Sequence, residues 1–157
     1  MRTWVDASTI IALDLAGETE ILRTLLGRVS LTQEVAEEVF TGRESRALRE
    51  AVGSWIDVLD VKGDRRRWMN LGLGRGEASL FLTPTGDRLV LDELPARTVA
   101  ESEGRQYVGL LGLLRAGVHT GTLGRSRGIE VIRKVVAAGF HLASHLYDAF
   151  LADLEGD

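Results

Sequence analysis

Four acidic residues could together form a metal site if the chain folds as an α/β protein: Asp6, Glu38, Glu77 and Asp92. Asp6 and Asp92 each end a short apolar segment typical of a strand. The carboxyl ends of parallel strands meet at one edge of a sheet, where ligands bind. Carboxylates crowded into one cleft repel one another, so such a cluster persists only if a cation or shared protons neutralise it. We therefore expect a site for Mg²⁺ or Mn²⁺.

The two glutamates are placed by helices that follow strands. Glu77 falls in the first turn of an expected helix, whose positive end favours a carboxylate. In the earlier acidic helix, Val35 and Val39 mark the buried stripe, and Glu38 lies about 60° from Val35 at 100° per residue. Glu37 points nearly the opposite way. We therefore expect Glu38 to border the core and Glu37 to be solvated.

Neighbouring residues could tune this site. Ser8 and Thr9 offer hydroxyls that could orient a carboxylate or a bound water, and Glu93 is a candidate fifth acid that could equally be exposed. A plainer interpretation stays open for each acid, because strand ends and first helical turns often carry acids that only cap a helix or solubilise a surface. Four such acids at one edge favour the metal site.

Size and composition exclude several classes of protein. The chain has 157 residues, 45% of them hydrophobic, and we expect one domain over 1–157, closed by a pair of helices within 126–157. With 0 Cys, disulfides, thiolate metal sites and cysteine nucleophiles are all excluded. No apolar stretch is long enough to span a bilayer, and the N-terminus lacks a signal-peptide pattern. We expect a cytoplasmic protein with no membrane partner.

The charged residues allow a nucleic-acid partner. The formal net charge of −4 argues against one, but bound divalent ions would offset it. Arginines dominate the 19 basic residues, and their planar fork suits phosphate, although a GC-rich genome would give the same bias. The candidate RNA-binding residues are Arg65, Arg66, Arg67, Trp68, Arg75 and Arg97. Trp68 could stack on an unpaired base. The alternatives are a solvated loop for the triple-arginine run and a structural ion pair for Arg97.

Strand-like and helix-like segments alternate along the chain, which predicts a mostly parallel sheet covered by helices on both faces, a three-layer α/β/α sandwich. The expected strands are 2–6, 28–32, 55–61, 88–92 and 106–110. The expected helices are 7–15, 18–26, 33–40, 44–52, 76–83, 95–104, 111–116, 128–138 and 144–154. Segment 62–74 has no clear period, so we expect a mobile loop there.

Two other motifs fail on their spacing. Gly72 begins a glycine-rich stretch, but Glu77 stands where a dinucleotide fingerprint needs its last glycine, and no Gly-Lys-Ser/Thr follows. His141 and His145 have the spacing of a helical zinc pair, yet Ser144 is expected to cap the helix and leave His141 outside it. We expect neither a nucleotide cofactor nor a zinc site.

A set of short segments spread over almost the whole chain carries a family resemblance. The segments are Val5-Asp6-Ala7-Ser8, Val35-Ala36-Glu37-Glu38-Val39, Leu73-Gly74-Arg75-Gly76-Glu77-Ala78, Leu91-Asp92-Glu93 with Arg97 and Ala100, Val108-Gly109 with Gly112, and Ala138-Gly139-Phe140. Together they resemble the PIN-domain proteins, specifically the small single-domain branch related to VapBC-type toxin ribonucleases. The Gly-Glu-Ala and Asp-Glu…Arg…Ala segments are the more specific ones.

The resemblance implies an endoribonuclease that hydrolyses RNA with Mg²⁺ or Mn²⁺. Carried over residue by residue, it assigns metal binding and catalysis to the four acids, with Ser8 and Glu93 in support. It also implies a homodimer and a small antitoxin protein as a partner. Ala7 and Leu110 stand where similar chains often have a hydroxyl residue, so the hydrogen bonding around the acids is expected to be thinner.

Two other functions compete with this one. A non-catalytic PIN-like module would bind RNA or a protein without cutting it. A phosphohydrolase of the haloacid-dehalogenase type would use Asp6 as a nucleophile, but it needs a second Asp two residues on, where this chain has Ser8. The phosphohydrolase is therefore disfavoured, while the binding module stays open.

Overall fold

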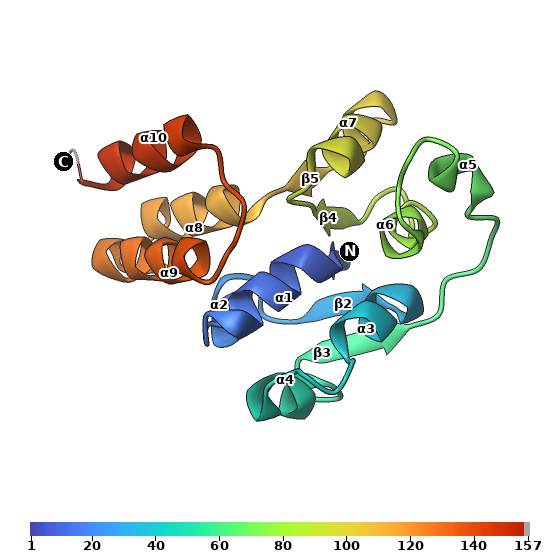
Figure 1. Cartoon of the computed structure of the whole chain (residues 1–157), viewed down its shortest axis with the longest axis horizontal. Coiled ribbons are helices and arrows are strands. Elements are labelled where there is room, and N and C mark those ends of the chain that lie inside the picture. Colours follow the sequence, from blue (N-terminus) through green and yellow to red (C-terminus); the bar gives the residue numbers. More distant parts are fainter. Residues whose placement is uncertain (156–157) are drawn as a thin grey trace.

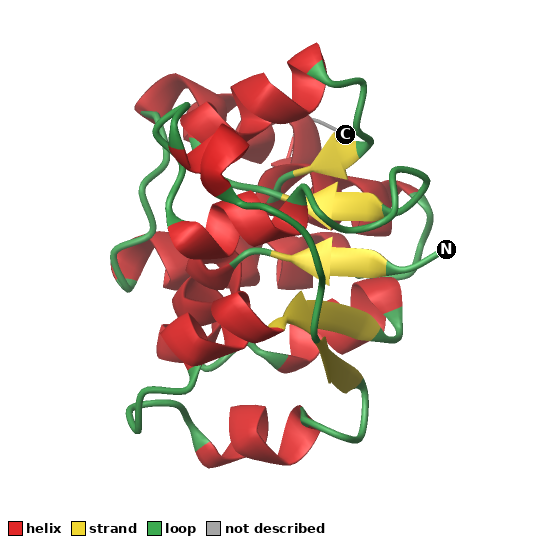
Figure 2. Cartoon of the chain, turned by 90° about the vertical axis from the view of Figure 1, so that its right-hand side faces the viewer, coloured by secondary structure: helices red, strands yellow, loops and turns green. Residues whose placement is uncertain are grey.

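Five parallel strands form the centre of this computed structural model, which describes residues 1–155. The strands are β1 (Thr3–Val5), β2 (Val29–Thr32), β3 (Ile56–Leu59), β4 (Arg88–Val90) and β5 (Tyr107–Val108), in the spatial order β3-β2-β1-β4-β5. In Figure 2 the strands run toward the same edge of the sheet, and every pairing between neighbouring strands is parallel. All five strands lie within the segments expected from the sequence.

Helices cover both faces of the sheet, which confirms the predicted three-layer α/β/α class. They are α1 (Ala7–Leu15), α2 (Glu20–Leu26), α3 (Gln33–Val39), α4 (Arg46–Ala51), α5 (Arg66–Met69), α6 (Arg75–Leu80), α7 (Leu94–Ser102), α8 (Leu110–His119), α9 (Arg125–Ala137) and α10 (Ser144–Glu155). Figure 1 shows α2, α8 and α9 on one side of the sheet and α5, α6 and α7 on the other. Helix α10 packs on α8 and α9.

The strands β1 and β2 at the centre of the sheet are fully buried. All residues of β1 and β2 are buried, including Trp4, whose indole N–H donates to Asp87 Oδ2 at 2.9 Å. Strands covered on both faces are typically continuous apolar runs rather than alternating ones. The sheet therefore forms a rigid core, and the polar residues that follow its strands are held at a fixed edge.

The order of the strands marks where a ligand would bind. Chain order runs outward in one direction through β1, β2 and β3, and in the other direction through β4 and β5. The switch lies between β1 and β4, and in open α/β sheets the crevice beyond the carboxyl ends at such a switch is the usual ligand site. Asp6 directly follows β1 and Asp92 follows β4 by two residues, so both stand at this crevice.

Several helix boundaries differ from those expected. Segment 62–74 contains the short helix α5, α8 extends to His119, and α9 begins at Arg125. The sequence suggested breaks near Gly117 and Gly128, but both glycines lie inside helices. A Cβ at Gly117 would overlap Leu25 of α2, and one at Gly128 would crowd Val118 of α8. These glycines therefore allow close packing between helices instead of ending them.

Across residues 1–155, no helix combines the length and apolar character needed to cross a lipid bilayer.

Candidate functional site

Asp6 and Asp92 form a hydrogen-bonded pair across the gap between β1 and β4. Asp6 caps α1, because its Oδ1 accepts a hydrogen bond from Thr9 N at 3.0 Å. Its Oδ2 accepts one from Asp92 N at 3.0 Å and one from the Ser8 hydroxyl at 3.2 Å. The Asp6 side chain is therefore fixed by two donors in the first turn of α1 and one from the end of the neighbouring strand, and only 3% of the residue is exposed.

The Asp92 carboxylate is held by groups from three further segments. The hydroxyl of Thr9 donates to Oδ2, and the backbone N–H of Leu110 donates to Oδ1 at 3.0 Å. Arg97 Nη2 lies 3.8 Å from Oδ1. Sequence reasoning expected thin hydrogen bonding because position 110 lacks a hydroxyl. The structure corrects this expectation, since the backbone of Leu110 and the side chain of Thr9 supply the donors.

The environment of Asp6 opposes its ionised form. The pKa of Asp6 is raised from 3.8 to about 6, because burial and then the nearby Asp92 charge outweigh the hydrogen bonds from Thr9 and Asp92 N that lower it. Two carboxylates in such proximity resist ionising together. A divalent cation between them would remove that conflict.

Glu38 and Glu77 form a second acidic pair, on α3 and α6. Glu77 Oε1 accepts a hydrogen bond from Gly74 N at 3.1 Å, whereas Oε2 is buried with no hydrogen-bond partner within residues 1–155. The Glu38 carboxylate lies against Gly76. Burial raises the pKa of Glu77 most, and the charges of Glu93 and Glu38 raise it as well, against the Gly74 N–H that lowers it. A buried carboxylate oxygen without a donor is suited to a cation.

The two helices that carry this pair, α3 and α6, contact each other through a hydrogen bond and direct packing. The hydroxyls of Thr32, which caps α3, and of Ser79 in α6 lie 2.7 Å apart in a buried hydrogen bond. Helices α3 and α6 also pack against each other directly. Glu38 and Glu77 are therefore brought together by tertiary packing, although they are 39 positions apart in the chain (77 − 38).

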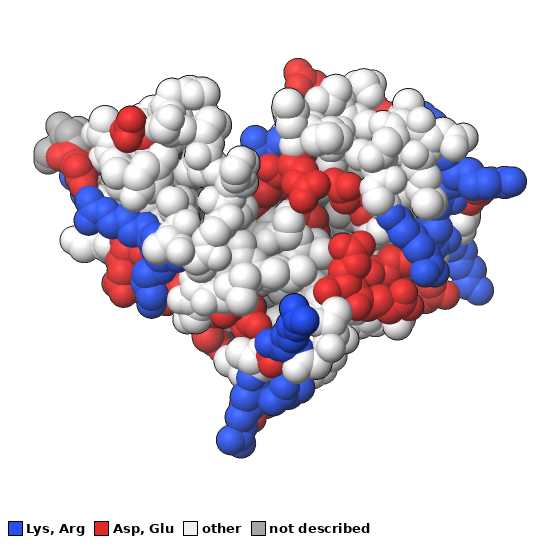
Figure 3. Space-filling model, viewed as in Figure 1, with Lys and Arg blue, Asp and Glu red and all other residues white. Residues whose placement is uncertain are grey.

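All four acids thus stand at the carboxyl edge of the sheet, but as two pairs. Figure 3 shows two groups of acidic side chains facing each other across a hollow, one over α3 and α6 and the other near β5 and the start of α7. Within residues 1–155, no three His, Asp or Glu side chains are placed so that they could enclose an ion as they stand. Binding a metal would therefore require side chains to move toward a shared ion.

The other acids of α3 have different roles. Glu37 is exposed and pairs with Arg75 across 3.7 Å, so Arg75 faces Glu37. Glu34 is buried and holds Arg65 Nε at 2.5 Å, a contact that sequence reasoning missed because the two residues are far apart in the chain. Glu38 is exposed, contrary to its expected place at the border of the core, yet its carboxylate reaches the site over Gly76. The two glutamates differ in their contacts with α6, since Glu38 lies against Gly76 whereas Glu37 faces Arg75.

The structure also corrects the expected role of Trp68 in the arginine-rich segment, whereas Arg66 and Arg67 are exposed. Trp68 is buried, stacks on Phe81 with 6.0 Å between ring centroids, and donates its indole N–H to Glu103 at 2.8 Å. Its ring is therefore not free to stack on a base. Arg67 lies over this ring and contacts Glu103, while Arg66 pairs with Asp64. Apolar packing of the indole explains why α5 forms here instead of a mobile loop.

Two hollows meet at Asp92, and sequence reasoning found neither. The first, here called the apolar hollow, measures about 710 Å³ and lies between α1, the start of α7 and the turn before α10, where Ile11, Leu15, Pro95 and Phe140 line it. The second, here called the α8–α10 groove, measures about 780 Å³. The residues that form each hollow come from distant parts of the chain, so no local pattern signals them.

Replacing Gly76 with Ala tests whether Glu38 matters at this site. A Cβ at position 76 would overlap Glu38 Oε1, and the flexible glutamate must swing away because the helix backbone cannot. Gly76→Ala should therefore lower the metal-dependent RNA cleavage that the family resemblance implies by roughly tenfold or more. The melting temperature should be unchanged or higher, since alanine favours a helix by up to about 1 kcal/mol. Activity and thermal melting measured on the same preparation check this, and equal activity would show that the position of Glu38 is immaterial.

Comparison with known proteins gives one match. A family model described as DUF3368, a PIN domain, matches residues 3–156. Neither the curated proteins nor the solved structures contain a significant match.

Proposed function

The chain belongs to the PIN-domain family, whose members are generally nucleases that use divalent metal ions, and from this premise we propose that it is an endoribonuclease dependent on Mg²⁺ or Mn²⁺. One observation carries the proposal. Asp6 and Asp92 meet at the switch point of the sheet, with Glu38 and Glu77 on the neighbouring α3–α6 pair. This proximity supports the proposal that these four acids, which the resemblance assigned to the metal site, act together.

The chemistry of these residues fits a hard divalent ion. Every candidate ligand is a carboxylate oxygen, which Mg²⁺ and Mn²⁺ prefer over nitrogen or sulfur. Glu77 Oε2 is buried without a donor, and burial together with neighbouring acids raises the pKa of both Asp6 and Glu77. When bound, the ion would activate water and screen the negative phosphodiester.

The chain's own residues would hold this site in shape. Thr9 and the Leu110 N–H orient Asp92, and the capping bond from Thr9 N orients Asp6. Fixed donors of this kind preserve the direction of a ligand's oxygens, and their removal typically costs 10- to 100-fold in metal affinity or activity. Arg97, 3.8 Å from Asp92, would place a positive charge beside the phosphate that is cut.

A matched pair of substitutions on α3 tests the proposal. Cleavage of a single-stranded RNA with Mn²⁺ is compared between the wild type, Glu38→Gln and Glu37→Gln. Both glutamates are exposed, so neither change should disturb folding. We expect a loss of at least roughly 100-fold for Glu38→Gln, since a ligand should matter at least as much as its supporting residues, and near-normal activity for Glu37→Gln. Equal activities, or cleavage that persists in excess EDTA, would contradict the proposal.

The alternative function is a PIN-like module that binds RNA or a protein without cutting it. The arrangement of the acids as two pairs rather than a ready cage favours this alternative. It predicts RNA binding by the wild type with no cleavage at any Mn²⁺ concentration, and identical binding by Glu38→Gln.

We further propose that the protein acts in the cytoplasm as the toxin of a toxin–antitoxin pair and forms a homodimer. The apolar hollow supports a protein partner, because Leu15 and Leu94 beside it are 69% and 75% exposed. Light scattering of the purified chain, with and without the product of an adjacent small reading frame, measures both associations. A chain that stays monomeric and does not bind that product would contradict both proposed associations.

A further inference from the structure

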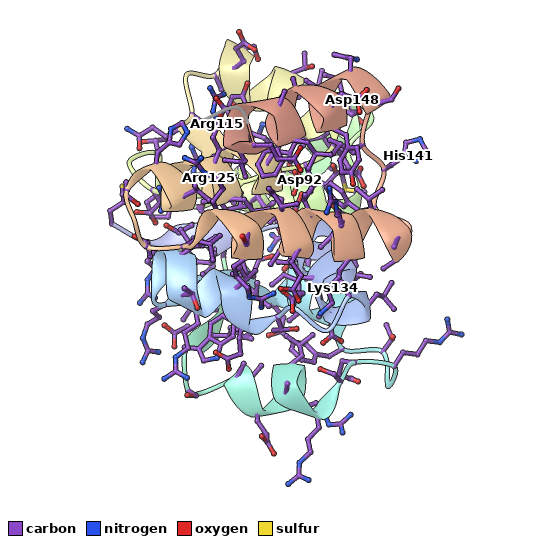
Figure 4. All side chains as sticks on the ribbon, turned by 90° about the vertical axis from the view of Figure 1, so that its left-hand side faces the viewer. Asp92, Arg115, Arg125, Lys134, His141 and Asp148 are labelled. Atoms are coloured by element: carbon purple, nitrogen blue, oxygen red, sulfur yellow. The ribbon has the colours of Figure 1, made fainter. Side chains whose placement is uncertain are left out.

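The α8–α10 groove begins at Asp92 and carries a cationic side chain, Arg115, that the acidic site does not use. Asp92, Arg97, Arg115 and His141 all line it. Figure 4 shows Asp92 between the ribbons of α9 and α10, with Arg115 toward one end of α10 and His141 toward the other. Asp153 lines the groove as well and lies against Arg115, so the groove leads from a proposed catalytic acid to an arginine–aspartate pair farther out.

Arg115 is positioned by one contact and keeps most of its hydrogen-bonding capacity. Its Nε lies 3.0 Å from Asp153 Oδ2 on α10, and the same oxygen lies 3.4 Å from His119 Nε2. The side chain is 59% exposed, and within residues 1–155 its two terminal nitrogens donate no hydrogen bond. A guanidinium fixed at Nε with both terminal nitrogens available suits two oxygens of one phosphate.

Arg97 stands at the inner end of the same groove. Its Nε donates to Leu91 O at 2.9 Å, and its Nη2 lies against Gly109, where a Cβ would overlap it. The two arginines thus lie along one channel, the first beside Asp92 and the second farther out. Phosphates that follow one another along a strand need cations at successive positions.

Building on the nuclease function above, we propose that the α8–α10 groove holds the RNA strand next to the phosphodiester that is cut, and that Arg115 is a positioning residue that binds a flanking phosphate. A groove of about 780 Å³ lies in the range that accommodates ligands of nucleotide size. The arginine-rich segment is less suited to this task, because Arg65, Arg66 and Arg67 do not line this groove. Apolar side chains such as Phe140 and Leu146 line the same groove and could contact ribose or base.

A purely structural role for Arg115 makes different predictions. In that case the Arg115–Asp153 contact would only tie α8 to α10, and removing either partner would have the same effect. If Arg115 binds phosphate, substituting the two partners should have different effects on RNA binding, because Asp153→Asn keeps the Arg115 cation and releases its Nε.

The test measures binding of a labelled single-stranded oligoribonucleotide by fluorescence anisotropy in EDTA, with the intact chain. Arg115→Gln should weaken binding roughly 10-fold and reduce the slope of log affinity against log salt by about 0.7, the value for one phosphate contact on a single strand. Asp153→Asn should bind as well as the wild type or better. The control is Arg46→Gln on α4, an exposed arginine paired with Glu50 at 2.7 Å and outside the groove, which should leave binding unchanged. With Mn²⁺, Arg115→Gln should raise KM and leave kcat near that of the wild type.

Two results would overturn the inference. The first is Arg115→Gln binding with the affinity and salt slope of Arg46→Gln. The second is an equal loss of affinity in Arg115→Gln and Asp153→Asn together with an equal fall in melting temperature, which would assign the contact a structural role. If the wild type binds RNA through Arg115 but never cleaves it, the groove is supported while the proposed catalysis fails.

Discussion

Asp92→Asn is expected to lower RNA cleavage by at least roughly 100-fold and, at the same time, to stabilise the metal-free protein. Asparagine has the same shape, its Oδ1 can accept the bond from Leu110 N, and its Nδ2 can donate to the Thr9 hydroxyl. What disappears is a negative charge beside the buried Asp6. A residue that serves catalysis at the expense of stability should behave in this way.

The size of the stabilisation follows from the repulsion that is removed. Two like charges near a protein surface repel by on the order of 1 kcal/mol or more, while the partly exposed Arg97–Asp92 contact that is lost contributes less. At pH 7.5 in EDTA, the melting temperature should rise by roughly 2–4 °C for a chain of this size. Calorimetric melting checks this, with Asp60→Asn, outside the site, as a control that should change neither quantity. A lower melting temperature for Asp92→Asn would mean that Asp92 is a structural residue.

The contribution of Asp6 to the stability of the metal-free protein should fall as the pH rises from 4 to 7. The folded state holds a proton on Asp6 up to a pKa of about 6, whereas the unfolded chain releases it near 3.8. Stability from this group is therefore fully present below pH 4 and is lost as the pH passes through 6. The shift corresponds to about 3 kcal/mol in all. Glu77, whose pKa is also raised, acts in the same direction.

Other acids have the opposite dependence, so a difference measurement is needed. The pKa values of Glu18 and Asp87 are lowered, because hydrogen bonds outweigh the effect of burial. The donors are Arg127 and Lys134 for Glu18, and Trp4 and Arg2 N for Asp87. The stability that these two carboxylates contribute is lost as the pH falls. Asp6→Ser keeps a good N-cap for α1 but cannot titrate in this range. Urea unfolding of the wild type and Asp6→Ser between pH 4 and 7 isolates Asp6, and the difference should grow with pH in favour of the variant. Parallel curves would show that Asp6 ionises freely in the fold.

Metal should reverse this loss. At pH 7, Mn²⁺ at about 100 times its dissociation constant should stabilise the wild type by about 3 kcal/mol, because it binds only the folded state. Asp6→Ser should gain much less under the same conditions.

Local sequence patterns predicted those parts of the structure that depend on near neighbours. Asp6 follows an apolar strand and caps the next helix, so its position was predictable from a few residues. The same holds for Asp92 at the end of β4 and for Glu77 in the first turn of α6. The family resemblance then linked these separate positions to one function, which spacing alone does not do.

Features that depend on tertiary packing were either missed or wrongly predicted from the sequence. The burial of Trp68 depends on Phe81 and Glu103, and the Arg65–Glu34 pair joins two distant segments. Gly117 is helical because it lets Leu25 approach α8 closely. Such contacts join residues far apart in the chain, so the periodicity and spacing of one segment carry no information about them.

Titration of Mn²⁺ into the metal-free protein at pH 7.5, followed by isothermal calorimetry, tests the shared metal site most directly. The account predicts saturable binding by the wild type, near-normal binding by Glu37→Gln, and a loss of at least roughly tenfold in affinity for both Asp92→Asn and Glu38→Gln, one from each acidic pair. No uptake by the wild type at millimolar Mn²⁺, or unchanged affinity in both variants, would contradict it.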